Sequence, residues 1–157
     1  MKIKELLSSS RSGDYQNSNY LKFVNETNFS FKVPSIHIAG TNGKGSTANY
    51  LCNIYQLSGL KVGLYTSPYL FEHNEMIQIN GVNISDSEFE KYYELFSKSF
   101  KKYNLSEFEI MTIIAFKYFE DNRCDLCIIE CGMGGEFDAT NIFTPILSVI
   151  TSISLEH

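Results

Sequence analysis

The sequence predicts an α/β domain whose mostly parallel sheet is flanked by helices. Short apolar runs alternate along the chain with segments whose apolar residues repeat at helical spacing, which is typical of parallel strands joined by helices. The first apolar run ends in a glycine-rich turn, at residues 39–47, that leads directly into a helical pattern. Ligands of such sheets bind beyond the carboxyl ends of the strands, so this turn marks the expected functional edge.

The bulk composition describes an ordinary globular protein. The 157 residues suffice for one domain with a buried core, and 43% of them are apolar and 20% charged. The formal net charge of −5 gives no electrostatic case for nucleic-acid binding. We expect Lys98, Lys101 and Lys102 to form the solvated face of a helix. Because no apolar run reaches membrane-spanning length and no signal peptide is apparent, we expect a cytoplasmic protein without a membrane partner.

The four cysteines raise the question of a metal or redox site, because Cys124 and Cys127 have the spacing CxxC. Cys127 begins an apolar run that indicates a buried strand, and residues three apart on a strand point to opposite faces. No second CxxC and no nearby histidine completes a site. We therefore expect reduced, partly buried thiols at Cys52, Cys124, Cys127 and Cys131.

The first part of the chain contains two expected strands and the helix between them. Residues 1–34 form a polar lead-in, and the stretch 11–19 is expected to be a loop because it is rich in Ser, Gly, Asn and Asp. The first strand then runs into the glycine-rich turn. Apolar residues at helical spacing predict a helix over 44–58, and Gly59 stands where a glycine commonly ends a helix. Residues 61–65 are the next strand.

Two helices are expected after a third strand, which covers residues 75–80 and is closed by an Asn-Gly turn. Ser85 with Glu88, and Ser106 with Glu109, have the spacing of a capping box, which predicts a helix start at both places. The second helix is apolar almost all round and is expected to be buried. The first carries an aromatic stripe that is expected to be core packing, formed by Phe89, Tyr92, Tyr93, Phe96, Phe100 and Tyr103.

Two further strands complete the expected sheet. Residues 126–130 are an apolar run that ends in the carboxylate of Glu130, and a glycine turn follows at 131–135. Residues 146–151 are the last strand. The glycine-rich loop, Ser67, Glu130 and the final residues all follow strand ends, so we expect them at one edge of the sheet.

The glycine-rich turn has the composition of a phosphate cradle. Glycines let backbone N–H groups approach an anion, the helix dipole adds positive charge, and a lysine and a hydroxyl can serve phosphate oxygens and Mg²⁺. The match to the general P-loop is imperfect, because Ile38 replaces its first glycine and Gly45 separates the lysine from the hydroxyl. A purely structural glycine turn therefore stays an alternative. The residues expected to contact a nucleotide are Gly40, Thr41, Asn42, Gly43, Lys44, Gly45, Ser46 and Thr47.

Four segments stand out together: AGTNGKGST at 39–47, GLYTSPYLFEHNEMIQING at 63–81, FEIMTIIAFKYF at 108–119 and IIECGMGGEFDATN at 128–141. In this order they resemble the folylpolyglutamate synthase/dihydrofolate synthase branch of the Mur ligases, over residues 34–154. The second and fourth segments separate this branch from the cell-wall ligases. The resemblance implies a P-loop NTPase-like fold, the ATPase domain of a Mur ligase.

The resemblance also implies an activity, the ATP-dependent addition of L-glutamate to folate or dihydropteroate. In this family ATP phosphorylates the substrate carboxylate, and the amine of glutamate then attacks the acyl phosphate. Such a reaction requires in-line positioning and neutralisation of charge around the γ-phosphate. ATP and Mg²⁺ are the implied cofactors, and Lys44 and Glu130 the implied catalytic residues. The implied metal-site residues are Ser46, Ser67, Glu130 and His157.

Glu130 and the loop that contains Ser67 have structural alternatives. An ionised carboxylate after a buried strand is costly unless it is paired or bound to a metal, and a salt bridge would satisfy Glu130 equally. For Ser67 the alternative is a simple loop cap before a proline. The resemblance places four residues in the loop on the pterin side of the substrate: Thr66, Pro68, Tyr69 and Leu70.

The chain departs from the family's usual pattern at several positions. The family usually has His at Tyr69, Phe at His73, and Arg at both Met76 and Glu136. The loss of two positive charges near a dianionic substrate leaves the substrate preference open, as it leaves open whether the first glutamate, later ones or both are added. We expect His73 to be a loop residue and His37 to be a satisfied core residue.

The family continues well beyond the length of this chain. Residues 1–154 are therefore expected to be the N-terminal part of the ATP-binding domain, without the C-terminal domain and the carbamylated lysine that helps to hold a second Mg²⁺. Residues 155–157 match the family's Leu-Asp-His in part, and a vector-derived origin is the preferred interpretation. We expect the isolated chain to be inactive. The alternatives are another Mur-type amide ligase and a non-catalytic nucleotide-binding module.

Overall fold

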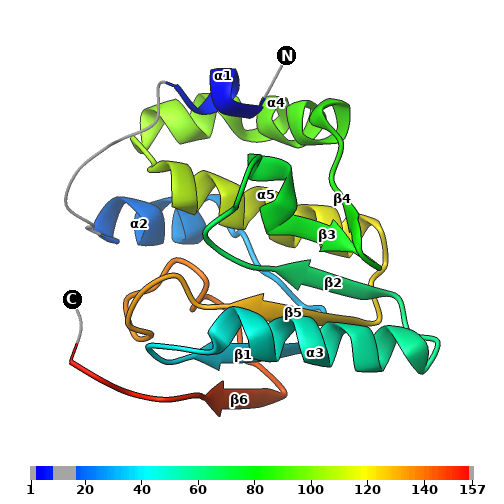
Figure 1. Cartoon of the computed structure of the whole chain (residues 1–157). Helices are drawn as coiled ribbons and strands as arrows, with labels where there is room; N and C mark the ends of the chain where they lie inside the picture. Colours follow the sequence, from blue (N-terminus) through cyan, green and yellow to red (C-terminus); the bar gives the residue numbers. More distant parts are fainter. Residues whose placement is uncertain (1–2, 9–16, 156–157) are drawn as a thin grey trace.

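The computed structural model describes residues 3–8 and 17–155, and it contains a six-stranded sheet with helices on both faces (Figure 1). The strand order is β4-β3-β2-β5-β1-β6. Strands β2, β5, β1 and β6 are parallel, and β3 and β4 extend the sheet in antiparallel fashion. The predicted α/β class with a mostly parallel sheet is thereby confirmed. The strands are β1 (Ser35–Ala39), β2 (Val62–Tyr65), β3 (Ile77–Ile79), β4 (Val82–Asn83), β5 (Leu126–Glu130) and β6 (Leu147–Ile150).

The helices form one thin and one thick layer. Helix α3 covers one face of the sheet alone, and α5, α4, α2 and α1 lie on the opposite side (Figure 1). A small apolar cluster, with Ile38 and Ala48, fills the space under α3. A much larger cluster, rich in aromatic rings, fills the thick side. The helices are α1 (Ile3–Leu7), α2 (Ser18–Thr27), α3 (Lys44–Leu57), α4 (Asp86–Lys102) and α5 (Glu107–Asp121), and a 3₁₀ turn, η1, covers His73–Met76.

Both predicted capping boxes begin a helix. The Ser85 side chain accepts a hydrogen bond from the backbone N–H of Glu88 at 3.2 Å, and Ser106 accepts one from Glu109 at 3.4 Å. In each case the glutamate side chain accepts a hydrogen bond from the backbone N–H of the serine. Two backbone N–H groups at the start of each helix, α4 and α5, therefore have a side-chain acceptor. The aromatic stripe of α4 is core packing as predicted, and α5 is buried almost throughout.

One predicted strand is shorter than expected, one predicted loop residue lies in a helical turn, and two elements were not predicted. The third strand is shorter than 75–80, because Glu75 accepts hydrogen bonds from the backbone N–H groups of Leu70, Phe71 and Glu72 and tightens this stretch into η1. His73 consequently lies in a 3₁₀ turn and is buried, not in an open loop. Strand β4 and helix α2 were not predicted. Helix α2 begins inside the expected loop 11–19, of which residues 11–16 lie outside the described part of the chain.

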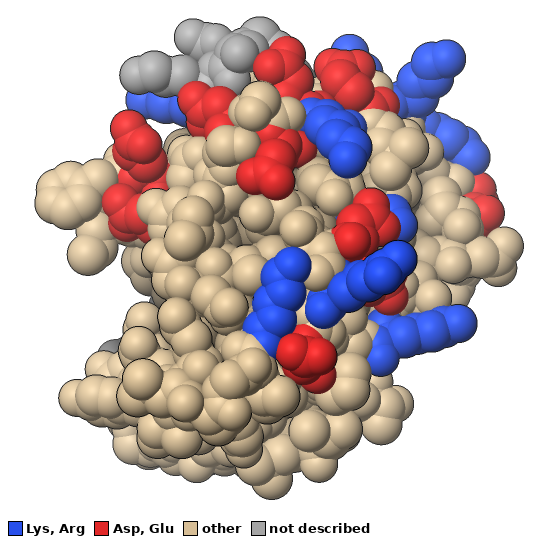
Figure 2. All heavy atoms as spheres, turned by 90° about the vertical axis from the view of Figure 1, so that its right-hand side faces the viewer, with Lys and Arg blue, Asp and Glu red and all other residues tan. Residues whose placement is uncertain are grey.

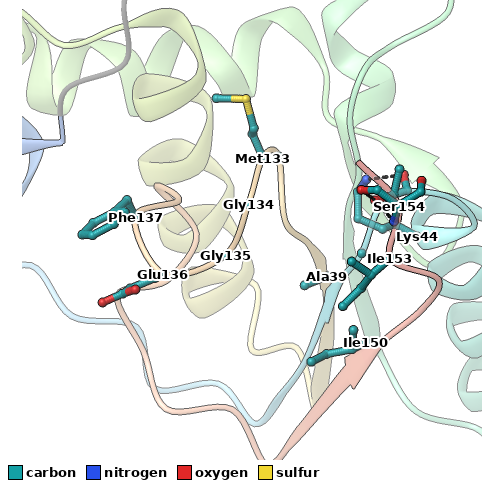
Figure 3. Close-up of a pocket in the computed structure, with 13 residues that line it drawn as sticks. Ala39, Lys44, Met133, Gly134, Gly135, Glu136, Phe137, Ile150, Ile153 and Ser154 are labelled. Carbon is teal, nitrogen blue, oxygen red and sulfur yellow. Dashed lines mark hydrogen bonds between the residues drawn. The ribbon is translucent and has the colours of Figure 1, made fainter. Parts of the chain in front are cut away.

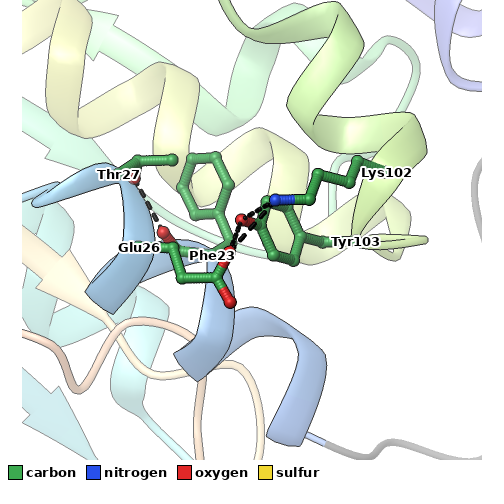
Figure 4. A network of polar contacts seen from close by, with 5 residues as sticks. All are labelled: Phe23, Glu26, Thr27, Lys102 and Tyr103. Atoms are coloured by element: carbon green, nitrogen blue, oxygen red, sulfur yellow. Dashed lines mark hydrogen bonds and ion pairs between the residues drawn. The ribbon is translucent and has the colours of Figure 1, made fainter.

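Helix α2 is attached to the C-terminal end of α4 by a polar network and by aromatic packing (Figure 4). The Glu26 carboxylate accepts hydrogen bonds from Lys102 Nζ, at 3.0 Å, and from the Tyr103 hydroxyl. The Phe23 ring packs edge-on against the Tyr103 ring, with 5.9 Å between centroids. This anchor buries the apolar side of α2, although the helix lies in a segment of polar composition.

The surface in Figure 2 carries basic and acidic side chains side by side, and a wide lower region carries none. As predicted, three lysines in the C-terminal part of α4 are exposed: Lys98, Lys101 and Lys102. All four cysteines have free, buried thiols, and the described residues contain no group of three His, Cys, Asp or Glu side chains that could hold a metal. Among the helices of the described segments, none has the length and apolar character needed to cross a membrane.

Candidate functional site

Three loops meet at the carboxyl edge of the sheet, because β2, β5 and β1 are neighbours in that order. The glycine-rich loop follows β1, the turn 131–135 follows β5, and the loop 66–72 follows β2. These are the segments that the sequence placed at one edge.

The glycine-rich loop presents an uncapped helix end. Gly43 is the N-cap of α3, with a φ of 86°, and provides no side-chain cap for the first turn. The free N–H groups and the helix dipole therefore point to a site for an anion. Lys44 Nζ donates to the carbonyl oxygen of Thr41 at 3.2 Å, which folds the lysine back over the loop. A positively charged cradle of this kind suits phosphate.

The segment after β6 holds the glycine-rich loop in place. The backbone N–H of Thr41 donates to the carbonyl of Ser152 at 2.7 Å, and Asn42 forms an isolated bridge with the same residue. A Cβ atom on Gly40, whose φ is 133°, would lie 2.1 Å from Thr151 Oγ1. The close approach of these two chain segments therefore requires a glycine at position 40.

A cavity of about 850 Å³ opens between this loop and the glycine turn after β5 (Figure 3). In Figure 3 Lys44, Ser154 and Ile153 line one side, and the turn from Met133 to Phe137 lines the other. This second wall was recognised in the sequence as a glycine turn, but its residues were not predicted to contact a ligand. The complete lining is Ala39, Gly40, Thr41, Lys44, Gly132, Met133, Gly134, Gly135, Glu136, Phe137, Ile150, Ile153 and Ser154.

Glu130 lies buried at the end of β5, with 4% of its surface exposed. Its Oε2 accepts a hydrogen bond from the backbone N–H of Ser67 at 3.1 Å. Burial raises the pKa of the Glu130 carboxyl, and the Ser67 N–H and the charge of Lys44 oppose that rise. In the described part of the chain no basic side chain lies within the 4.0 Å of a salt bridge, so the salt-bridge interpretation finds no support.

The surroundings of Glu130 fit a magnesium ion. A Cβ on Gly45 would lie 3.4 Å from Oε2 and 3.7 Å from Oε1, so the absence of a side chain leaves the carboxylate open toward the first turn of α3. Ser46, the next residue on that turn, is exposed. One carboxylate with hydroxyl, phosphate and water oxygens is a ligand set that Mg²⁺ accepts. Ser67 contacts Glu130 through its amide, and the predicted ligand His157 lies outside the described residues.

The loop after β2 is braced on both sides. The Ser67–Pro68 peptide bond is cis, and the Tyr69 ring packs against the His73 ring with 4.2 Å between centroids. His73 Nε2 lies 3.0 Å from Glu107 Oε1 at the start of α5. Thr66 is half-buried at the base of the loop, and Pro68, Tyr69 and Leu70 are exposed, with Phe71 beside them. The loop thus presents a firm, largely apolar surface beyond Glu130. Phe71 was not among the predicted residues.

Comparison with known proteins identifies the relatives of this chain. The folylpolyglutamate synthase of Lacticaseibacillus casei is 39% identical over 129 residues, and the dihydrofolate synthase/folylpolyglutamate synthase of Bacillus subtilis is 43% identical over 133 residues. A solved structure described as an FPGS–AMPPCP–folate complex superposes on the whole chain with a TM-score of 0.89 and 33% identity.

The chain matches one part of folylpolyglutamate and dihydrofolate synthases. The resemblance stated from the sequence is confirmed by these relatives, which are similar in both sequence and fold. The matches cover 78% and 80% of this chain but only 30% and 31% of the two synthases, and 42% of the solved synthase chain. The chain therefore spans about a third of the length of the synthases. A comparison with models of protein families finds no match.

Proposed function

We propose that this chain is the N-terminal part of an ATP-dependent ligase that adds L-glutamate to folate or dihydropteroate through an acyl phosphate. The observation that carries the proposal is the uncapped start of α3 with Lys44, which faces the cavity beside the buried carboxylate of Glu130. A relative of this fold is described as a complex with AMPPCP, an ATP analogue, and folate, which supports both a nucleotide and a folate-type acid as substrates.

The proposed roles of the residues follow from their chemistry. The N–H groups at residues 43–46 and the ammonium of Lys44 hold the phosphates and neutralise charge that develops on the γ-phosphoryl group. Gly40, Thr41, Asn42 and Thr47 form the remainder of the cradle. The cavity walls restrict water near the acyl phosphate, which would otherwise hydrolyse before glutamate attacks.

Mg²⁺ is proposed because the side chains at this place offer oxygen ligands of the kind that the ion prefers. Glu130 and Ser46 would hold the ion, with Ser67 and His157 as the further predicted ligands. When bound, the ion supplies positive charge to the phosphate oxygens. The chain's own contribution is to keep Glu130 oriented, through the Ser67 N–H, and to keep the space above it free at Gly45.

The acid substrate is proposed to lie against the loop after β2. Thr66, Pro68, Tyr69 and Leu70 belong to this loop, and its braced apolar surface suits a flat heteroaromatic ring. The position of Glu136 in the cavity wall, where the family usually has an arginine, leaves the preferred glutamate chain length open.

Two further proposals concern the chain as a whole. Residues 1–154 would be the N-terminal part of the ATP-binding domain, and the chain alone would be inactive because it spans about a third of the synthases' length. The free thiols of all four cysteines support a reducing compartment, the cytoplasm. Another Mur-type ligase and a non-catalytic nucleotide-binding module remain the alternatives that an assay must separate.

Substitution of Lys44 by alanine tests the phosphate site in the complete ligase. We expect the variant to keep the circular dichroism and melting temperature of the wild type and to lose at least about 100-fold in ATP-dependent turnover, because one donor or cation at developing charge contributes this much. Exposed Lys98, on α4 and away from the cavity, provides the matched variant Lys98→Ala. Wild-type turnover in folded Lys44→Ala protein would refute the proposed role of the loop.

A further inference from the structure

Asp138 is a buried carboxylate behind the glycine-rich wall of the cavity, with 7% of its surface exposed. Its Oδ2 accepts a hydrogen bond from the backbone N–H of Met133 at 2.8 Å. Its Oδ1 accepts from the backbone N–H of Thr140 at 2.9 Å and from the Thr140 hydroxyl at 2.5 Å. Its own N–H donates to the carbonyl of Gly135 at 3.1 Å. One residue thus closes the whole turn that lines the cavity.

The Thr140 hydroxyl extends this network to β1. The hydroxyl has one proton, and the carboxylate of Asp138 can only accept, so Thr140 Oγ1 donates to Asp138. The oxygen is then the acceptor for His37 Nε2, which lies 2.8 Å away, and His37 must carry its proton on Nε2. His37 belongs to β1, three residues before Gly40. It is satisfied in the core, as predicted from the sequence, but its partner leads to the opposite wall of the cavity.

Two side-chain amides support the far end of the turn, since Asn141 Nδ2 donates to the carbonyl of Glu136 at 3.1 Å and Asn17 Nδ2 to that of Phe137 at 3.4 Å. A Cβ atom on Gly134 or Gly135 would meet nothing within 4 Å, so side-chain packing does not hold this part of the wall. At Gly132, in contrast, a Cβ would lie 3.1 Å from Asp138 Oδ2, which shows how closely the carboxylate approaches the turn. The hydrogen bonds of Asp138 therefore fix the first part of the turn, at Met133 and Gly135.

We propose that Asp138 is a positioning residue, which through Thr140 and His37 sets the glycine turn at a fixed place relative to the phosphate loop. The two walls of the cavity follow different strands, β1 and β5, and the His37–Thr140–Asp138–Met133 chain of hydrogen bonds connects them. The positioning rests on the hydrogen bonds alone. Its consequence, tighter binding of nucleotide phosphates in the cavity, rests on the proposed function.

Hydrogen exchange on the 157-residue chain tests the positioning directly. In Asp138→Asn the Oδ1 side can still accept from Thr140, but an amide NH₂ replaces the acceptor for the Met133 N–H. We expect the Met133 amide and its neighbours at 132–137 to exchange about tenfold faster or more, because a hydrogen bond to a charged acceptor is lost. Asp125→Asn is the matched control, since Asp125 Oδ2 accepts the Lys61 backbone N–H at 2.8 Å far from the cavity.

Thr140 provides a second pair of variants in case Asp138→Asn does not fold. Thr140→Ser keeps the hydroxyl and should exchange at residues 132–137 like the wild type, whereas Thr140→Val should exchange faster. If the Thr140 side chain acted only by filling space, the presence of the hydroxyl would not distinguish the exchange rates of these two variants. Equal exchange in Thr140→Ser and Thr140→Val, or unchanged exchange in folded Asp138→Asn, would overturn the proposal.

A titration with Mg·ADP, followed by amide NMR spectra of the same chains, tests the consequence. We expect Asp138→Asn and Thr140→Val to bind Mg·ADP several-fold more weakly than the wild type, and Asp125→Asn and Thr140→Ser to bind it equally. Equal binding by all five chains would overturn the link between the wall and the nucleotide. If the wild-type chain bound no Mg·ADP, the proposed function would lose its support, and hydrogen exchange would still decide the role of Asp138.

Discussion

Gly45 lies over the carboxylate of Glu130, and a single added Cβ atom would stand 3.4 Å from Oε2. The missing side chain and the buried carboxylate together leave a space that contains oxygen ligands on one side and free helix N–H groups on the other. This pairing between α3 and β5 is the geometric basis of the proposed metal and phosphate site.

The first prediction concerns this carboxylate. Glu130→Gln keeps the shape and the oxygen that accepts from Ser67, but it removes the negative charge. We expect the Mg²⁺ concentration for half-maximal activity of the complete ligase to rise about tenfold or more, since a hard cation loses an anionic ligand. The measurement is a Mg²⁺ titration at saturating ATP. Glu94→Gln, at an exposed acid on α4, is the control, and an unchanged titration for Glu130→Gln would remove Glu130 from the metal site.

The second prediction concerns the close approach at Gly40. Gly40→Ala places a methyl group against Thr151 Oγ1 in a left-handed backbone conformation. We expect the free energy of unfolding to fall by roughly 2–5 kcal/mol, from backbone strain and overpacking together. Gly59→Ala has a positive φ of 92° but free space around it, so it should lose only about 1 kcal/mol. Urea unfolding of both variants gives the comparison, and equal losses would show that the Thr151 contact does not matter.

The third prediction concerns pH. Burial lowers the pKa of His37 below its ordinary value of 6.5, while the charge of Asp138 opposes this change. Between the lowered pKa and 6.5 the unfolded chain binds more protons than the folded one, so stability rises with pH there and is lost as pH falls. His37→Gln retains an N–H donor for Thr140 without a titratable ring. Urea unfolding between pH 5 and 7 should show that the free energy of unfolding rises less steeply with pH in the variant than in the wild type. An equal rise with pH in both proteins would contradict the lowered pKa of His37.

The sequence predicted those parts of the fold that local patterns determine. The capping boxes, the aromatic stripe of α4 and the buried strand that ends at Glu130 all depend on spacing within one segment, and each was confirmed. Helix α2 was not predicted, because its stability comes from Phe23 and Glu26 meeting the end of α4, contacts that lie about 77 positions apart in the chain. The 3₁₀ turn η1 was missed because it depends on Glu75 turning back to three backbone N–H groups.

The candidate site divides in the same way. The phosphate loop and Glu130 were found because a glycine-rich turn before a helix and an acid after a buried strand have a local signature. The opposite wall and the link from His37 to Thr140 were not found, since the two residues are 103 positions apart and only the parallel pairing of β1 with β5 brings their segments together.

We propose that, in the complete ligase, the cavity between the phosphate loop and the glycine turn is the place of ATP-dependent ligation of glutamate to a pteroate-type acid. The most direct measurement is ADP release by the complete ligase, with Mg²⁺ and ATP, in the presence and absence of each other substrate. We predict rapid release only when a pteroate-type acid and L-glutamate are both present. Release that is equally fast without either of them, or with a cell-wall precursor and another amino acid, would contradict the claim.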